Sequence, residues 1–371
     1  MAYQHYWVGL DAGHLETAVC LIDSEGGILF EAICKTNSGP IRDILRRFGV
    51  EAAQCLTIEA GNGTQMVREL RSFGFPVQVV DVRKSSKFLA IRRQKTDVHD
   101  ARGLAELGRL ARSLGSQVFV KPMEHQNIRT LINVRRTMLK NRARTDALIQ
   151  SIFIFRLYGG NVKLSNGRGA LATEVNDQVR KMRHHGLEIG VNLQPLVEIS
   201  ETLREQISAL DRQVRDIAAN NPTCRNFQTI PGVGAVIALS FYSAIGDPHR
   251  FVRSRNVGAY LGLTPTLYQS GATSRRGRIS RHGNKLTRTH LITAATVLLC
   301  RIEIESRLRT WGLELAQRVG FLKARVAVAR KLAVIMLGMW KSGSPFRADA
   351  ATALFLQQEE AGLDPVLISG T

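Results

Sequence analysis

The chain has 371 residues and a formal net charge of +20, because 51 lysines and arginines outnumber 31 aspartates and glutamates. This length predicts two or three domains with ample core. The positive excess predicts a polyanionic partner, nucleic acid before a membrane surface, because Lys and Arg that neutralise phosphates release counterions. No uncharged apolar run approaches the roughly 20 residues that span a bilayer, and the N-terminus lacks a basic leader, so we expect neither membrane insertion nor a signal peptide.

The cysteines give no metal-ligand spacing, and three of them fall in strand-like runs. They are Cys20, Cys34, Cys55, Cys224 and Cys300. Free cysteines behave as small apolar side chains where the compartment is reducing. We therefore expect reduced core residues of a cytoplasmic protein.

The first hundred or so residues predict an α/β domain. The predicted strands span 6–10, 17–22, 28–34, 55–59 and 77–81. The predicted helices span 40–48, 65–73 and 98–112. Short turns between the first three strands indicate an antiparallel meander. Three strands followed by helix, strand, helix, strand and helix is the order of the RNase H-like fold, which we predict here.

Four carboxylates occur at element ends within this domain. Asp11 and Glu59 each close a strand, and Asp97 and Asp100 flank the start of the last helix. The carboxyl ends of neighbouring strands share one edge, and i, i+3 residues share a helix face, so we expect the four to converge. Like charges so close repel, and oxygen-only ligands suit Mg²⁺ or Mn²⁺, which in pairs serve displacement at a phosphodiester. The alternative is that the four acids are ordinary solvated loop residues. We favour it less, because all four occur together at two strand ends and one helix start.

Basic residues form a loop-like stretch after the fifth predicted strand. They are Arg83, Lys84, Lys87, Arg92 and Arg93. A basic loop is often only a solvated face, but beside acids that need a phosphate substrate we favour contact with a nucleic-acid backbone.

Two long helical patterns follow, over 125–158 and 195–220. The second has apolar residues spaced by three and four, as in a coiled-coil seam. They are Leu196, Ile199, Leu203, Ile207, Leu210, Val214 and Ile217. Packing on the first long helix explains this seam at least as well as dimerisation, and both can hold. The first helix carries Arg135 and Arg136 among many basic residues, so we expect one of its faces to meet nucleic acid.

Glycines follow the second helical pattern. Gly232 and Gly234 precede the apolar helix 235–244 and resemble the turn of a helix-hairpin-helix module, where backbone N–H groups approach a phosphate. The alternative is a purely structural turn. Residues 250–290 contain no Asp or Glu, so this stretch is predicted to meet a polyanion. Its arginines assigned to nucleic acid are Arg275, Arg276, Arg278, Arg281 and Arg288.

Ser270 precedes a glycine in this arginine-rich stretch. Guanidinium groups would stabilise the charge that develops on an attacked phosphate, so Ser270 is a candidate nucleophile. From the residues alone, a serine that only hydrogen-bonds phosphate is the more frequent case.

Two separate motif sets resemble one protein family. Segments 9–11, 58–60 and 95–101 are similar to the RuvC-like domain of DEDD insertion-sequence transposases, the Piv-like "one-ten" family. Segments 230–234, 262–265, 270–271 and 277–280 independently resemble the C-terminal domain of the same family. One departure is Thr287, which stands at a usual leucine position while Arg288 is kept.

The resemblance implies a DNA recombinase whose Asp11, Glu59, Asp97 and Asp100 bind Mg²⁺. It also implies that Ser270 attacks DNA and forms a phosphoserine link, which reverses the preference drawn from the residues alone. Dimers that assemble into tetramers, donor and target DNA, and a bridge RNA as guide are implied as partners. A bacterial protein associated with the nucleoid while it acts is expected. The alternatives are a metal-dependent junction nuclease without a covalent intermediate and a catalytically silent scaffold.

The predicted organisation follows from these assignments. Residues 1–115 form a RuvC-like DEDD metal-binding domain, and residues 116–225 a helical coiled-coil linker for dimerisation. Residues 226–345 form a mainly helical transposase domain that carries Ser270, and residues 346–371 a C-terminal tail.

Overall fold

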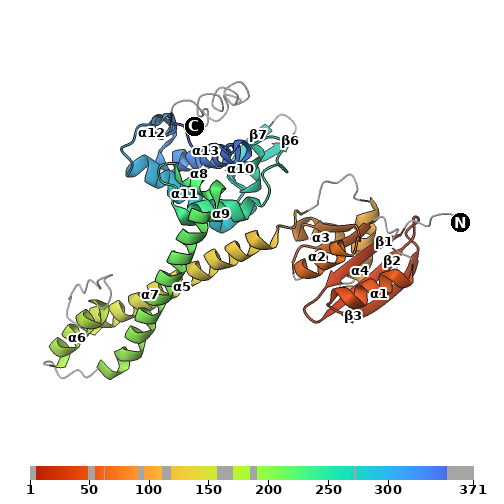
Figure 1. The fold of residues 1–371 in the computed structure, drawn as a ribbon, viewed down its shortest axis with the longest axis horizontal. Coiled ribbons are helices and arrows are strands. Elements are labelled where there is room, and N and C mark those ends of the chain that lie inside the picture. The colour runs from red at the N-terminus through yellow and green to blue at the C-terminus, as the bar shows by residue number, and fades with distance from the viewer. Residues whose placement is uncertain are drawn as a thin grey trace. The chain divides into compact units, whose positions relative to one another are not determined.

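The computed structural model describes residues 6–48, 55–61, 63–90, 96–110, 118–156, 170–183, 190–270 and 273–348. The chain divides into two compact units, Met1–Val120 and Lys121–Thr371. The first unit contains a sheet covered by helices, and the second is mainly helical (Figure 1). The mixed α/β class with N-terminal sheet and C-terminal helices is thus confirmed. The predicted boundaries of the four parts, and the RuvC-like identity of the first, stay predictions.

A five-stranded sheet forms the centre of the first unit, in the order β3-β2-β1-β4-β5. Its strands are β1 (Trp7–Ala12), β2 (Glu16–Ile22), β3 (Ile28–Lys35), β4 (Cys55–Glu59) and β5 (Val77–Val80). The first three pair antiparallel, whereas β4 runs parallel to β1 and β5 parallel to β4. In the β1–β4 pair, Leu10 lies opposite Ile58, so the two strands end at the same edge of the sheet.

Helices cover both faces of this sheet, because its strands alternate between two buried sides. The helices are α1 (Ser38–Arg47), α2 (Thr64–Ser72), α3 (Val82–Leu89) and α4 (Asp97–Leu110). Val8, Leu10 and Ile58 pack with residues of α1 and α2 in one core. Ala18 and Cys20 pack with α4 in another. The part of the predicted basic loop from Val82 to Leu89 is in fact the helix α3, capped by the Asp81 side chain, which accepts a hydrogen bond from Arg83 N.

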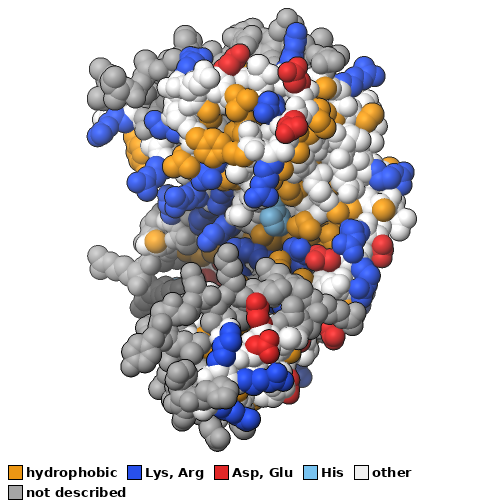
Figure 2. Space-filling view, turned by 90° about the vertical axis from the view of Figure 1, so that its left-hand side faces the viewer, with side chains coloured by type: hydrophobic (Ala, Val, Ile, Leu, Met, Phe, Trp, Pro, Cys, Tyr) orange, Lys and Arg blue, Asp and Glu red, His pale blue; other side chains and the backbone are white. Residues whose placement is uncertain are grey.

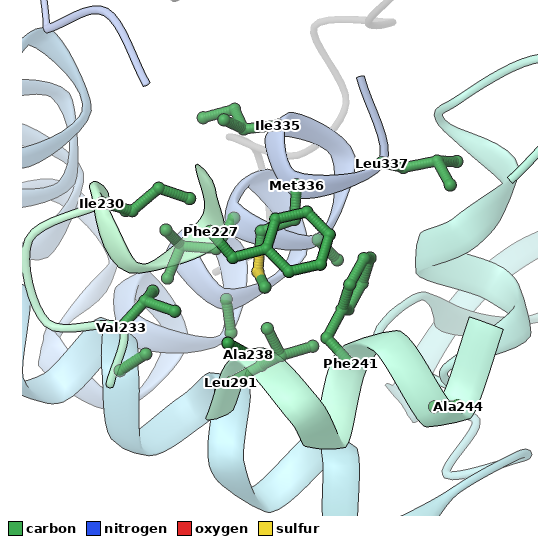
Figure 3. Close-up of a cluster of buried hydrophobic side chains, with 14 of the residues drawn as sticks. Phe227, Ile230, Val233, Ala238, Phe241, Ala244, Leu291, Ile335, Met336 and Leu337 are labelled. Atoms are coloured by element: carbon green, nitrogen blue, oxygen red, sulfur yellow. The ribbon is translucent and has the colours of Figure 1, made fainter. Parts of the chain in front are cut away.

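The second unit begins with two long helices that pack along each other, α5 (Met123–Arg156) and α7 (Gly190–Asn220), with α6 (Ala170–Arg183) beside them (Figure 1). The remaining elements are α8 (Pro222–Gln228), α9 (Ala235–Ile245), α10 (Asn256–Tyr260), β6 (Pro265–Ser270), β7 (Thr273–Ile279), α11 (Lys285–Cys300), α12 (Arg307–Val319) and α13 (Phe321–Ser342). Phe227, Phe241 and Met336 are fully buried where α8, α9 and α13 meet (Figure 3).

The face that α7 buries in this chain is rotated from the predicted seam. Ile207 and Val214 are buried as expected, but Ile199 is 50% exposed, and Val197 and Ser200 are buried instead. The buried stripe includes polar residues such as Ser200, so the spacing of apolar residues alone does not decide which face packs against α5. The coiled-coil identity of the pair, and dimerisation through it, stay predictions.

Candidate functional site

The carboxyl edge of the sheet brings two of the predicted ligands to one side. Gly9 and Thr57 lie on the face covered by α4, since a Cβ on Gly9 would touch Ala101 and Thr57 touches Gly108. Asp11 and Glu59 follow each of these by two residues, and residues two apart in a strand face the same side. Both carboxylates are half-buried. Asp11 and Glu59 therefore lie on the α4 side of adjacent strand ends.

The direction of α4 brings the other two acids to the same edge. A Cβ on Gly9 would lie 1.9 Å from the Ala101 carbonyl oxygen and 2.4 Å from Ala105 N, so the helix backbone rests directly on β1. Further along the helix, a Cβ on Gly108 would lie 2.1 Å from Thr57 Oγ1 and 3.8 Å from the Trp7 ring. The helix thus runs opposite to β1, and its first turn, with Asp97 and Asp100, lies at the strand ends.

Local contacts hold two of these acids, Glu59 through its side chain and Asp100 through its backbone. Glu59 Oε1 accepts a hydrogen bond of 2.6 Å from the hydroxyl of Ser85, which is fully buried in α3. Asp100 N donates to the Thr96 carbonyl at 2.8 Å in the first turn of α4. Carboxylates are favoured at a helix N-terminus because the peptide dipoles place partial positive charge there. Asp97 is exposed and Asp100 half-buried, so both acids remain accessible to a ligand.

The four acids share an edge, but they do not close around a common point. Within the described part of the chain, no three His, Cys, Asp or Glu side chains form a group that could hold a metal ion. Like-charged carboxylates repel at short range, and a cation would be needed to draw them together. An all-carboxylate donor set fits a hard divalent cation such as Mg²⁺ or Mn²⁺. The residues thus fit such an ion in chemistry and in common location.

Ser270 is the last residue of β6 and is exposed. It lies opposite Thr273 in the antiparallel pair with β7, and residues 271–272 are outside the described residues. Arg275 and Arg278 on β7 are exposed, as is Arg281 just beyond it. The backbone position of Arg276 is opposite Leu267. Ser270 is thus presented to solvent at the end of a hairpin whose second strand carries arginines.

The predicted basic residues of the first unit are placed in part. Arg83, Lys84 and Lys87 are exposed on α3, the helix that also supplies Ser85. Arg83 Nη2 contacts Asp81 Oδ2 at 3.1 Å, and this contact holds the pKa of Asp81 below its usual range. Arg92 and Arg93 lie outside the described residues.

The glycine turn before α9 has a packing reason of its own. Gly232 has φ +88°, and a Cβ there would lie 3.1 Å from the Ala294 carbonyl oxygen on α11. Gly234 caps α9, and a Cβ there would meet open space. Gly232 is therefore explained by turn geometry and close packing, whereas Gly234 leaves the helix start open to a ligand.

The predicted basic residues around α11 divide into two groups. Arg288 is buried, and its Nη1 donates to the carbonyls of Leu261 at 2.8 Å and His282 at 3.0 Å. This contact supports the loop and differs from the predicted nucleic-acid contact. Arg135 forms an ion pair with Asp211 between α5 and α7, and Arg136 is half-buried. Figure 2 shows a group of Lys and Arg side chains near the middle of the left-hand edge of the view.

Two buried or half-buried residues, one in each unit, were not singled out from the sequence. Ser85 lies within the basic stretch, but nothing in its neighbours indicated that its hydroxyl would reach Glu59, which is 26 residues away along the chain. His290 lies near Arg135 and Arg136, which together with burial lower its pKa to about 4. Both contacts join elements distant in sequence, so no local pattern indicates them.

Comparison with known proteins adds independent information. Residues 8–154 match the model of a DEDD transposase domain, and residues 224–310 match a model described as "Transposase IS116/IS110/IS902 family". A transposase for insertion sequence element IS1111A from Coxiella burnetii is 30% identical over 311 residues, which cover 80% of each chain. The chain belongs to the IS110/IS116/IS902 family of transposases.

Other transposases agree with this assignment. A probable family 20 transposase from Pseudomonas aeruginosa is 28% identical over 83% of this chain and 89% of its own length. A transposase for insertion sequence element IS1328 from Yersinia enterocolitica is 28% identical over 76% of this chain and 81% of its own length.

Family membership sets the general chemistry of the two matched regions. Transposases bind DNA and cleave and transfer its strands, and the DEDD domain suggests use of a divalent metal. The DEDD match contains Asp11, Glu59, Asp97 and Asp100, and the second match contains Gly232, Gly234 and Ser270. No helix among the described residues is long and apolar enough to span a membrane.

Proposed function

We propose that this transposase cleaves and rejoins the DNA strands of its insertion sequence through a phosphoserine intermediate on Ser270. In this proposal, Asp11, Glu59, Asp97 and Asp100 hold Mg²⁺ or Mn²⁺. The observation that carries it is the common location of these four acids on the α4 side of one sheet edge. The exposed position of Ser270 at the end of an arginine-bearing hairpin supports the covalent step.

The covalent step exchanges one phosphodiester for another. Ser270 Oγ attacks the phosphorus, a P–Oγ bond forms, and one P–O bond to deoxyribose breaks. The serine proton passes to a carboxylate of the DEDD set, and the leaving deoxyribose oxygen takes up a proton. Rejoining is the reverse step, in which a hydroxyl of a second DNA end attacks the phosphorus and the P–Oγ bond breaks. The phosphoester is exchanged and is not hydrolysed by water. Exposed Arg275 and Arg278 would neutralise charge that develops on the phosphate.

The DEDD residues supply the other half of the chemistry. A divalent cation, when bound, stabilises charge on the reacting phosphate oxygens. Ser85 fixes the direction of the Glu59 carboxylate, and the start of α4 stabilises Asp97 and Asp100 as anions. In this proposal the carboxylates of one subunit act with the serine of another, which requires a dimer and then a tetramer.

The remaining basic surface is proposed to hold donor and target DNA and a bridge RNA. The net charge of +20 supports large polyanionic partners. Arg83, Lys84 and Lys87 on α3, together with Arg281 after the hairpin, are exposed at the surface. Arg92 and Arg93 stay in the proposal from sequence. The transposase would act on the bacterial nucleoid in the cytoplasm.

The test compares Ser270→Ala with Asp11→Asn in purified full-length protein, using DNA that spans an end of the native element. Wild type should form a protein–DNA adduct that survives denaturation, and Ser270→Ala should lose the adduct and strand cleavage while it still binds DNA. Asp11→Asn should fail to cleave DNA at any Mg²⁺ concentration. Normal hydrolysis by Ser270→Ala would instead indicate a metal-dependent junction nuclease, and recombination by Asp11→Asn would contradict the metal site.

A further inference from the structure

An exposed aromatic side chain lies beside the candidate nucleophile. Tyr268 precedes Ser270 by two residues on β6, so both side chains face the same side of the hairpin. Residues i and i+2 of a strand are about 6.6 Å apart, roughly two base steps of about 3.4 Å. Tyr268 is 66% exposed, so its ring is available to a bound molecule.

The hairpin backbone provides a support for this ring. The pairing shifts by one residue between Pro265 and Leu267, which places a bulge in β7 near Gly277. A Cβ on Gly277 would lie 3.1 Å from Tyr268 Cε2 and 2.4 Å from Thr266 Oγ1. The ring therefore lies against the glycine of the partner strand, where any larger residue would displace it. A single exposed apolar side chain is ordinary, but a ring that contacts a glycine of the partner strand has a defined position.

The charge around the ring favours a nucleic acid as its ligand. Arg275 lies directly opposite Tyr268 in the strand pair and is exposed. No Asp or Glu occurs in residues 250–290 to repel a phosphate. Proteins that bind single-stranded nucleic acid combine positive charge with aromatic side chains. The bases stack on the aromatic rings, since every base has a flat face.

We propose that Tyr268 stacks on a base next to the phosphate that Ser270 attacks, and so positions that phosphate. This inference rests on the proposed serine mechanism. Tyr268 is a positioning residue, and its ring rather than its hydroxyl makes the contact. Base–aromatic stacking is worth about 1–3 kcal/mol, which corresponds to a change of about fivefold to 150-fold in the rate of adduct formation.

The experiment uses the full-length transposase and DNA duplexes that span an end of the native element. Single 2-aminopurine bases are placed at successive positions, because the fluorescence of this base falls when it stacks. Five proteins are compared: wild type, Tyr268→Ala, Tyr268→Phe, Gly277→Ala and Leu267→Ala. Leu267 is the matched control, because it is 61% exposed and faces the opposite side of the same strand.

Wild type should change the fluorescence at one position next to the adduct phosphate, and Tyr268→Ala should abolish that change and slow adduct formation by about fivefold or more. Tyr268→Phe and Leu267→Ala should keep both signals. Gly277→Ala, which displaces the ring, should resemble Tyr268→Ala. An unchanged signal in Tyr268→Ala, or equal loss in Tyr268→Phe or Leu267→Ala, would overturn the inference. Absence of any adduct in wild type would refute the serine mechanism, while the fluorescence scan would still decide whether Tyr268 stacks.

Discussion

The direction of the Glu59 carboxylate at the end of β4 is fixed by a side chain from the helix α3. The Ser85 hydroxyl lies 2.6 Å from Glu59 Oε1, against 3.1 Å and 3.2 Å from the carbonyls of Asp81 and Val82. A hydroxyl has a single proton to donate, so the shortest contact, to the carboxylate, receives it. Ser85 therefore acts on the proposed metal site without touching the metal.

Ser85→Ala is expected to weaken the metal site while it leaves the fold intact. Groups that orient a metal ligand typically change metal affinity by about tenfold to a hundredfold. The measurement is the Mg²⁺ concentration that gives half-maximal DNA cleavage. Ser86→Ala is the matched control, because Ser86 is the exposed neighbour and donates to the Arg83 carbonyl. An equal shift in both variants would show that α3, not the hydroxyl, is responsible.

His290 makes stability depend on acidity. Burial and the charges of Arg135 and Arg136 lower its pKa to about 4, and its Nδ1 has no hydrogen-bond partner among the described residues. The unfolded chain binds the proton near pH 6.5, so stability falls as the pH drops from 6.5 to about 4. The loss attributable to His290 is on the order of 2–3 kcal/mol. Denaturant unfolding at pH 7 and pH 5 should show a smaller loss in His290→Gln than in wild type.

At the scale of elements, the backbones of α4 and β1 touch directly at Gly9, because glycine has no side chain to separate them. Gly9→Ala would place a methyl group 1.9 Å from the Ala101 carbonyl oxygen, so α4 must move away from the strand. Such overpacking typically lowers stability by about 1–3 kcal/mol, and here it also moves Asp97 and Asp100. Thermal unfolding and DNA cleavage should both decline. Gly61→Ala, where a Cβ meets open space, should leave both nearly unchanged.

The part of the predicted α7 seam that this chain leaves exposed, at Ile199, is where dimerisation can be tested. Ile199 is 50% exposed, so a charge there does not disturb the packing of α7 on α5. Ile199→Glu is expected to weaken a dimer formed through this stripe at least tenfold, because a carboxylate would be buried in an apolar contact. Sedimentation velocity over a range of protein concentrations measures this. Thr202→Glu, at an exposed position on the same helix, is the control for added charge. Unchanged dimerisation in Ile199→Glu would place the interface elsewhere.

The sequence predicted the strands, and the places of Asp11 and Glu59 at strand ends, better than the helix α3 or the contacts of the arginines. Strand ends follow from short apolar runs and the turns after them, so these local patterns suffice to assign Asp11 and Glu59 to one edge. The segment after Asp81 looked like a loop, because its basic residues and serines carry no apolar stripe. Arg288 looked like its exposed neighbours, because its carbonyl partners depend on how the loop folds back. Tertiary contacts of polar side chains leave no periodic signal.

For the whole molecule, the net charge of +20 predicts DNA binding that weakens steeply with salt. Arg278→Ala is expected to lower the salt dependence of DNA affinity by about one unit of slope or less without a change in stability. Arg288→Ala is expected to do the reverse, since it leaves two carbonyls unpaired and lowers stability by about 1–3 kcal/mol. DNA affinity at several salt concentrations and denaturant unfolding separate the two. A large loss of stability in Arg278→Ala would contradict its exposed position.

The direct backbone contact of α4 on β1 also bears on engineering this transposase. A large apolar core of the first unit packs against α1 and α2 on the opposite face of the sheet. Substitutions in that core can raise thermal tolerance without altering the spacing of the carboxylates. Gly9 and Gly108 allow no such freedom, because no side chain there can be resized. A directed-evolution library should therefore vary the α1–α2 face and leave these two glycines unchanged.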